Sequence, residues 1–320
     1  MQRWSLVVLI LGGLTVLMVG QSRGREWRID GTLIRDSGVV RSLDLNAEDM
    51  ERLIYGVDEI PGYECRPNPY NGIHTLIGLN SNGDKLSGWL RSHIVRGWTN
   101  VSTVKLLRVE VRVYDKPASE YETYENYRWG TQVLPVKGSF SGLPLGEECF
   151  RYGKKQIWFR LGRCVAEIAL LVRREEELAD GLYIEALAWG IAYRVQQHPK
   201  RLGMAQRAMT VLVAQRPVAQ GAAMSLAGVT VAPVSLLKEA GTETTVNRTR
   251  EEWVVTLKRN GRWVKVKAFS WEMETGKGRV KLERPVFPYK GELIVPLRQV
   301  AEALGMVVHQ RGQTIALMAK

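Results

Sequence analysis

The sequence predicts an α+β protein in which an apolar N-terminal segment is followed by two small α+β domains. Three observations lead to this prediction. Residues 1–25 contain an uncharged apolar stretch, strand-like and helix-like stretches alternate across residues 26–200, and residues 208–320 contain a short strand–helix pattern twice. The 320 residues are 45% hydrophobic and 24% charged, as in folded globular proteins, and this length suits two ordinary domains.

Residues 1–25 have the pattern of a secretory signal peptide. Arg3 precedes the uncharged stretch Trp4–Val19, and small residues follow at 20–22. Sixteen helical residues reach ~24 Å, which is shorter than the ~30 Å hydrocarbon core, so a spanning helix would need residues 4–22. Residues 1–25 are therefore either a signal peptide that is cleaved or a membrane anchor that is retained. Either way we expect a secreted or cell-surface protein that contacts membrane only through residues 4–22, if they are uncleaved.

Residues 26–200 read as strands and helices in turn. Asn46 is a good cap for a short helix over residues 47–55. Alternating apolar and polar residues predict a half-buried strand over Val101–Tyr114. Ser119 and Glu122 form a capping box for a tyrosine-bearing helix over residues 119–128. The tyrosines fit a half-buried helix edge, and sugar stacking is the alternative.

A hairpin and a long helix complete this region. Strands at 156–161 and 164–172 flank Gly162-Arg163, a two-residue turn in which Leu161 opposes Cys164. Apolar residues at helical spacing then predict an amphipathic helix that ends at His198-Pro199; they are Ile184, Leu187, Ala188, Ile191 and Val195.

Three cysteines, Cys65, Cys149 and Cys164, do not make a disulfide framework, because an odd number leaves at least one outside any intramolecular pair. The hairpin register separates Cys149 from Cys164. A bridge between Cys65 and Cys149 stays open.

Several stretches of this region resemble a loose class of exported bacterial domains of unassigned function. The resemblance is carried by Ile60-Pro-Gly-Tyr63, Leu145-Gly-Glu147, Trp158-Phe-Arg-Leu-Gly162 and Glu185-Ala-Leu-Ala188. Arg163 replaces the asparagine usual in that class. The resemblance implies a binding or scaffold role for residues 27–200.

The strongest pattern in the chain is a repeat in residues 208–320. Val231-Ala-Pro-Val-Ser-Leu-Leu-Lys-Glu-Ala-Gly241 returns as Ile294-Val-Pro-Leu-Arg-Gln-Val-Ala-Glu-Ala-Leu-Gly305. In each copy a proline, Pro233 or Pro296, opens a short helix, and a glycine, Gly241 or Gly305, closes it. We expect strands after each glycine, at Trp253–Leu257 in the first copy and at Met306–Val308 and Thr314–Met318 in the second. The domain is therefore predicted to be a duplicated strand–helix–strand unit, and repeats of this kind usually build surfaces.

The second copy resembles the copper amine oxidase N-terminal-like domain, also called the stalk domain. Its stretch Val295-Pro-Leu-Arg298, followed by Ala301-Glu302-Ala-Leu-Gly305, matches the motif of that family almost letter for letter. The first copy is degenerate, with Ser235 in place of the arginine. Opening strands at Met209–Val213 and Val229–Val231, and a hairpin around Asn260-Gly261, fit the same family. We expect Arg298 to donate hydrogen bonds to carbonyls of a neighbouring turn; an anion contact is the functional alternative.

The net charge of +12 is concentrated near the C-terminus. Residues 208–320 hold 17 lysines and arginines against 9 acidic residues. This excess fits a basic surface that is simply solvated. The functional alternative is that it attracts a polyanion. For an exported protein we expect anionic cell-wall polymers rather than nucleic acid, since no nucleic-acid motif of known spacing is present.

Catalytic, cofactor-binding and metal-binding residues are not predicted. The sequence has no nucleophile elbow, no zinc-protease helix and no P-loop. Its four histidines, at positions 74, 93, 198 and 309, are scattered without ligand spacing, so the copper in the family name has no predicted site. Cys164 reads as a small buried hydrophobe rather than a nucleophile.

We therefore expect an exported non-enzymatic surface protein with a structural or envelope-binding role. One alternative is a secreted ligand-binding protein that uses the 119–128 helix, and another is a cell-wall hydrolase with unrecognised catalytic residues. The residues that carry the expectation are structural: Pro233, Gly241, Pro296, Arg298, Glu302 and Gly305.

Overall fold

The computed structural model describes residues 4–11, 14–21, 47–65, 72–74, 90–100, 106–114, 145–152, 155–171, 181–198, 202, 204 and 208–319. The tyrosine-bearing helix expected at 119–128 lies outside these residues. The described part is rich in sheet and contains few helices, which agrees with a mixed α and β composition.

The apolar N-terminal stretch is a hairpin of two strands, β1 (Trp4–Leu11) and β2 (Leu14–Gln21). The strands pair antiparallel, with Leu11 opposite Leu14. Short apolar runs suit a strand as well as a helix, because periodicity does not separate the two. Within the described residues, no helix is long and apolar enough to cross a membrane. The role of residues 1–25 as signal or anchor stays a prediction.

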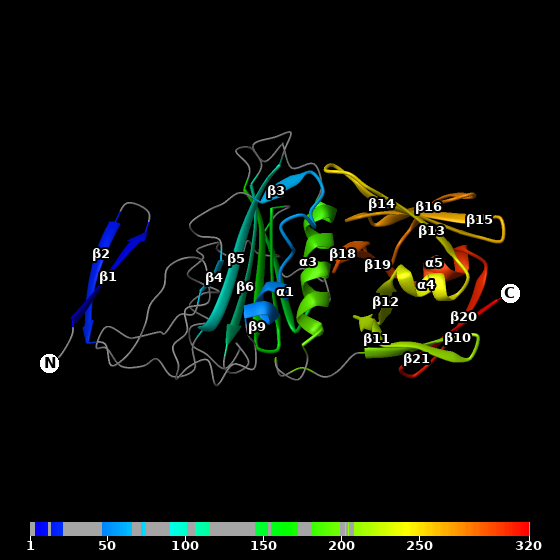
Figure 1. The fold of residues 1–320 in the computed structure, drawn as a ribbon, viewed down its shortest axis with the longest axis horizontal. Helices are drawn as coiled ribbons and strands as arrows, with labels where there is room; N and C mark the ends of the chain where they lie inside the picture. The colour runs from blue at the N-terminus through cyan, green and yellow to red at the C-terminus, as the bar shows by residue number, and fades with distance from the viewer. Residues whose placement is uncertain are drawn as a thin grey trace.

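The region that follows is built on an antiparallel sheet, which we call the first sheet (Figure 1). Its strand order is β3-β5-β6-β9-β8-β7, and β4 also pairs with β5. The strands are β3 (Tyr63–Cys65), β4 (Gly72–His74), β5 (Leu90–Asn100), β6 (Leu106–Tyr114), β7 (Glu148–Tyr152), β8 (Gln156–Leu161) and β9 (Cys164–Leu171). The β8–β9 hairpin has the predicted register, with Leu161 opposite Cys164 and Phe159 opposite Ala166.

Residues on β6 alternate between the two faces of the first sheet, as predicted. Val109, Val111 and Val113 are fully buried in the hydrophobic core, on the face that α3 (Gly181–Gln196) covers. The intervening residues, including Glu110, lie on the opposite face. The structure has no disulfide bond among the three cysteines, so the bridge left open between Cys65 and Cys149 is not formed.

Helix α3 was expected to be amphipathic, and the structure corrects this. Every residue from Ile184 to Gln196 is buried. One side of the helix packs on β8 and β9, and another packs on β18 (Phe287–Tyr289) of the C-terminal region. A helix covered on all sides has no solvent face to leave polar. The shorter helix α1 (Ala47–Arg52) forms where the N-terminal helix was expected, but ends earlier.

The C-terminal region has two sheets (Figure 1). The second sheet has the order β18-β19-β12-β11-β10-β21-β20, and only its β10–β21 pair is parallel. Its other strands are β10 (Ala208–Val213), β11 (Arg216–Leu226), β12 (Val229–Pro233), β19 (Glu292–Pro296), β20 (Met306–Arg311) and β21 (Thr314–Ala319). The third sheet, which we call the meander, runs β13 (Glu243–Arg248), β14 (Trp253–Arg259), β15 (Arg262–Lys267), β16 (Glu272–Thr275) and β17 (Gly278–Lys281) in chain order.

The two copies of the sequence repeat lie side by side. Strands β12 and β19 pair antiparallel, with Ala232 opposite Val295, and each leads into a short helix, α4 (Ser235–Glu239) or α5 (Leu297–Ala303). The copies diverge after their glycines, because β13 joins the meander whereas β20 joins the second sheet. The strand expected at Trp253–Leu257 is present as β14, but it is not the first strand after Gly241, because β13, which was not predicted, precedes it. The hairpin of β14 and β15 is confirmed, with Asn260 and Gly261 both at positive φ, as a type I′ turn requires.

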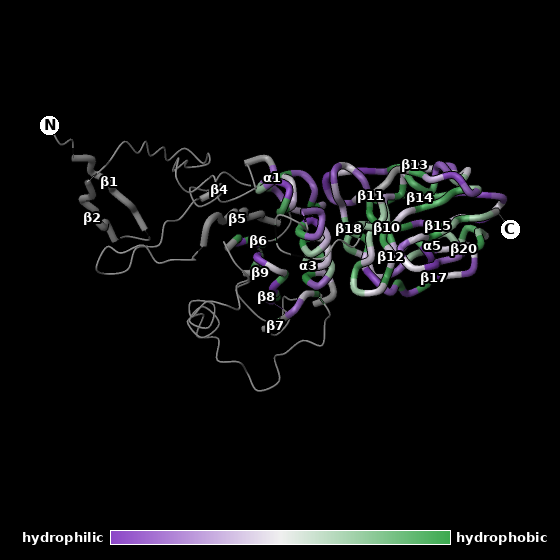
Figure 2. Tube along the Cα trace, turned by 90° about the horizontal axis from the view of Figure 1, so that it is seen from below, coloured by the Kyte–Doolittle hydropathy of each residue, from purple (hydrophilic) through white to green (hydrophobic). Residues whose placement is uncertain are grey.

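A single hydrophobic cluster runs through both regions. It includes Val111 of the first sheet, Trp189 of α3, Phe287 of β18 and Val255 of the meander. Figure 2 shows that apolar stretches continue from α3 into the second sheet, whereas β13 and β17 are mostly hydrophilic. The fold therefore brings its two regions together on α3, and several polar groups are buried at that junction.

Candidate functional site at the junction

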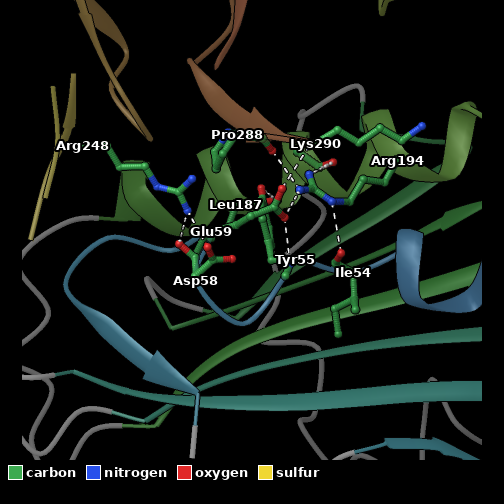
Figure 3. Close-up of polar contacts among 11 residues, drawn as sticks. Ile54, Tyr55, Asp58, Glu59, Leu187, Arg194, Arg248, Pro288 and Lys290 are labelled. Atoms are coloured by element: carbon green, nitrogen blue, oxygen red, sulfur yellow. Dashed lines mark hydrogen bonds and ion pairs between the residues drawn. The ribbon is translucent and has the colours of Figure 1, made fainter. Parts of the chain in front are cut away.

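Arg194 of α3 is the centre of the junction (Figure 3). Its side chain is 1% exposed. The guanidinium donates from Nε to the Ile54 carbonyl at 3.2 Å, from Nη1 to the Gly190 carbonyl at 3.2 Å and from Nη2 to the Pro288 carbonyl at 2.8 Å. Since Nη2 also donates to Glu59 Oε2 at 2.6 Å, every guanidinium nitrogen is engaged.

Glu59 holds three segments of the chain with one carboxylate. Its Oε2 accepts from Arg194 and from the Gly56 amide, the latter at 2.7 Å. Its Oε1 accepts from the Lys290 amide at 3.1 Å. Gly56 belongs to the α1–β3 connection, Arg194 to α3 and Lys290 to the turn between β18 and β19. The carboxylate therefore joins the C-terminal region to α3 and to the α1–β3 connection.

Tyr55 fills the space beneath this ion pair. Its hydroxyl donates to the Leu187 carbonyl at 2.9 Å, and the Arg194 guanidinium lies 4.1 Å from its ring centroid. Burial raises the pKa of Tyr55 well above its usual value, although the Arg194 charge works in the other direction. A Cβ on Gly190 would collide with the Tyr55 hydroxyl and lie 2.8 Å from Cζ. Glycine at position 190 therefore permits α3 to approach Tyr55.

An aromatic layer surrounds the polar groups. Phe269 of the C-terminal region packs edge-on against Tyr55 and Tyr183, with ring centroids 5.5 and 5.3 Å apart. Tyr193 packs at a tilt against Phe287 and edge-on against Tyr289, with ring centroids 5.3 and 5.1 Å apart. Phe269 has φ +61°, a backbone conformation that is strained for a residue with a side chain. Its surroundings hold it there, since its amide donates to the Val286 carbonyl at 2.7 Å.

A second set of contacts lies at the β13–β14 turn. The Gly62 amide donates to the Arg250 carbonyl at 2.8 Å. Arg248 Nη2 donates to the main-chain carbonyl and to Oδ2 of Asp58, at 2.8 and 2.9 Å, and Arg250 forms an ion pair with Glu64. These ion pairs are exposed, so their net contribution is about 0–1 kcal/mol each.

Arg284 makes a third connection. It donates to the Leu226 carbonyl at 3.2 Å and to the Ala227 carbonyl at 2.7 Å, and its guanidinium lies 4.5 Å from the Trp189 ring centroid on α3. Partial burial lowers the pKa of Arg284. The three connections together tie α3 and the 54–64 segment to both sheets of the C-terminal region.

The chemistry of the junction is structural. Its arginines and its carboxylate are taken up by carbonyls, amides and each other, which leaves them poorly placed to transfer a proton or to attack a substrate. Burial raises the pKa of the Cys164 thiol to about 12, so the reactive thiolate is scarce at neutral pH, in agreement with its interpretation as a buried hydrophobe.

The first sheet brings together two carboxylates that sequence inspection missed. Glu110 and Glu167 are register partners on β6 and β9, and both are buried. Arg108 and Arg112 form ion pairs with Glu110, and the Gln156 amide donates to Glu167 at 2.8 Å. The alternating polar residues of β6 were the available signal, but the partner strand could not be known. Carboxylates held in this way fit a structural ion cluster better than a hydrolase pair.

The motif residues lie on or beside the two short helices α4 and α5. Pro233 ends β12 two positions before α4 begins, and Pro296 ends β19 and is the N-cap residue of α5. Gly241 and Gly305 follow the helices, both at φ +79°, a conformation that favours glycine. Glu302 is exposed on α5. The partner expected for Arg298 was wrong: its Nη2 donates to the side-chain oxygen of Gln310, at 3.3 Å, rather than to main-chain carbonyls.

The copper implied by the family name would need a group of ligand side chains close together. In the part of the chain that the structure describes, no three histidine, cysteine or acidic residues are grouped to hold a metal ion. His74 and His93, which look scattered in the sequence, are register partners on β4 and β5. Two histidines alone are fewer than the two histidines and one cysteine of a trigonal copper site.

Comparison with protein families gives one match. The model of the copper amine oxidase N-terminal domain matches residues 212–318, which confirms the resemblance predicted for the C-terminal region. That domain is non-catalytic and stalk-like. Comparison of the chain with curated proteins and with solved structures finds no match. The looser resemblance of residues 27–200 stays a prediction, as do the boundaries 26–200 and 208–320.

Proposed function

We propose that the chain is an exported, non-enzymatic structural protein of the bacterial cell surface. Its C-terminal region is a stalk-type module, and its first region is displayed on that module in a fixed orientation. The match of residues 212–318 to a non-catalytic, stalk-like domain supports the first half of this proposal. The junction supports the second.

The observation that carries the proposal is the Arg194–Glu59 pair. Both residues belong to the first region, and each contacts the β18–β19 segment. Arg194 donates to the Pro288 carbonyl, and Glu59 accepts from the Lys290 amide. Because a buried guanidinium without these partners would cost several kcal/mol, the two regions are expected to keep one relative orientation. A stalk that fixes the orientation of what it carries needs a junction of this kind.

Export is supported by the apolar segment at residues 4–22, after Arg3. The basic excess of the C-terminal region supports contact with anionic polymers of the cell wall. In this proposal the chain is secreted, or held at the cell surface by the N-terminal segment.

The proposal that the chain is exported is tested by fractionating bacteria that express the tagged full chain. The chain should be found in the envelope or the medium, and a variant without residues 2–25 should stay in the cytoplasm. Recovery of the full chain from the cytoplasm would overturn export. Incubation with peptidoglycan tests the enzymatic alternative: release of soluble fragments that depends on Glu110 and Glu167 would overturn the non-enzymatic role.

A further inference from the structure

The end of the meander farthest from the junction carries an exposed group of cations around a tryptophan. Strand β14 starts at Trp253, beside the turn that contacts the first region, and ends at Arg259. Its seven residues span about 20 Å. We define the distal tip by the two turns at that end and the residues beside them: Lys258, Arg259, Arg262, Trp263, Gly276 and Lys277.

Two arginines of the distal tip anchor it to the helices beneath. Arg259 donates from Nε to the carbonyl of Ala240, at the C-terminal end of α4, at 3.2 Å. The Arg262 guanidinium lies against Gly305, just after α5, 3.1 Å from where a Cβ would be. Both cations therefore face the negative end of a helix, and the tip is held firmly.

The remaining residues of the distal tip face solvent. Trp263 is 38% exposed, which makes it one of the few large exposed hydrophobic side chains in the described residues. Lys258 is its register partner on β14. A Cβ built on Gly276 would lie 3.4 Å from the indole nitrogen of Trp263. Because residue 276 is a glycine, no side chain of this turn covers that edge of the ring. Lys277 is the next residue of the same turn.

The charges of the distal tip are only partly balanced. Lys265 is paired with Glu274 at 3.6 Å, and Glu243 is the register partner of Lys258 on β13. Lys258, Arg262 and Lys277 form no ion pair with any residue that the structure describes. The tip therefore offers positive charge beside a flat aromatic surface, which complements a polymer that alternates anionic groups with apolar C–H faces.

We propose that Trp263, Lys258 and Lys277 bind an anionic glycan or polyol polymer of the bacterial cell wall. This inference rests on the proposed function, which puts such polymers within reach. The indole would pack against the C–H face of a sugar or polyol unit, and the ammonium groups would contact neighbouring phosphates or carboxylates. A membrane surface is a poorer occupant, because insertion needs a broad apolar face and the tip has a single exposed aromatic ring.

Co-sedimentation of the purified full chain with bacterial cell walls tests the inference. We expect the chain to pellet with walls at low salt and to be released at high salt, because exposed charges are screened. The variant Trp263→Ala/Lys258→Glu/Lys277→Glu should bind roughly tenfold more weakly. Walls from which acid has removed the anionic polymers should not bind the wild-type chain.

A matched variant controls for net charge. Val280→Ala/Arg216→Glu/Lys281→Glu removes an exposed hydrophobic side chain and reverses two exposed cations outside the tip, so it should pellet like the wild type. Equal loss in both variants would overturn the tip as the binding site, and so would retention of binding by the tip variant, while wall contact itself would stand. Undiminished binding to acid-extracted walls would overturn the anionic polymer as occupant. Failure of the wild type to pellet at any salt would overturn wall contact altogether.

Discussion

Arg194 and Glu59 form an ion pair of 2.6 Å within the first region, and each also contacts the β18–β19 segment of the C-terminal region. The two residues are 135 positions apart in the sequence, and their partners in the β18–β19 segment are 94 and 231 positions away. One buried interaction therefore holds together three segments that the chain itself keeps far apart. Its removal should affect both regions at once.

Glu59→Gln should destabilise the fold by about 3–5 kcal/mol, because it leaves the Arg194 charge buried without a carboxylate. Urea denaturation followed by circular dichroism measures this. Glu274→Gln is the matched control, since its pair with Lys265 is about half-exposed and should cost less than about 1 kcal/mol. If Glu59→Gln and Glu274→Gln destabilise the fold equally, the buried junction pair contributes no more than an exposed surface pair.

Gly190→Ala should destabilise the fold by about 1–3 kcal/mol, since the new methyl group collides with Tyr55. Tyr55→Phe alone should also destabilise, by about 1 kcal/mol, because it removes the hydrogen bond to Leu187. The two changes together should cost less than their sum, as the lost hydroxyl is the atom closest to the new methyl. Strict additivity in a double-mutant cycle would contradict the contact.

Phe269→Gly should be less destabilising than Phe269→Ala, by about 1 kcal/mol. Both remove the ring that packs on Tyr55 and Tyr183, but only glycine adopts the observed φ of +61° without strain. Thermal unfolding of the two variants gives the comparison. Greater stability of the alanine variant would mean that the left-handed conformation is not kept.

Stability should fall as the pH rises above about 10, the unfolded pKa of tyrosine. Burial raises the pKa of Tyr55, Tyr183 and Tyr193 in the folded state. Their neutral forms are therefore favoured by folding: this stability is fully present below the unfolded pKa and is lost as the pH rises toward the folded values. Urea denaturation from pH 7 to 11 measures the loss.

Tyr183→Phe sharpens that test. The Tyr183 hydroxyl is buried without a hydrogen-bond partner among the described residues, so its removal should be neutral or stabilising at pH 7. Above about pH 10, the variant should also lose less free energy of unfolding than the wild type, by up to about 1.4 kcal/mol per pH unit. An unchanged pH profile in the variant would show that Tyr183 ionises equally well in both states.

Local features of the fold could be predicted from the sequence. The turns at Gly162-Arg163 and Asn260-Gly261 set their hairpin registers, and the proline and glycine of each repeat set the ends of α4 and α5. In each case neighbouring residues determine the backbone, so no knowledge of distant segments is needed.

The junction could not be predicted, because its partners are distant in the sequence. Apolar spacing in α3 predicted one buried side of the helix but not that the rest of its surface is buried as well. A signal was present: Gly190 stands in the middle of the helix, where glycine is unfavourable by about 1 kcal/mol, and so indicates close packing. Nothing local identifies Tyr55 as what packs there, or Glu59 as the partner of Arg194.

Native-state hydrogen exchange across the junction is the most direct test that the two regions form one body through α3. Amides of α3 and of the β18–β19 hairpin should open with the same free energy, and Arg194→Met should lower both by the same amount. If the β18–β19 amides stay fully protected in a variant whose α3 amides exchange freely, the two regions unfold independently. That result would contradict the claim that they form one body.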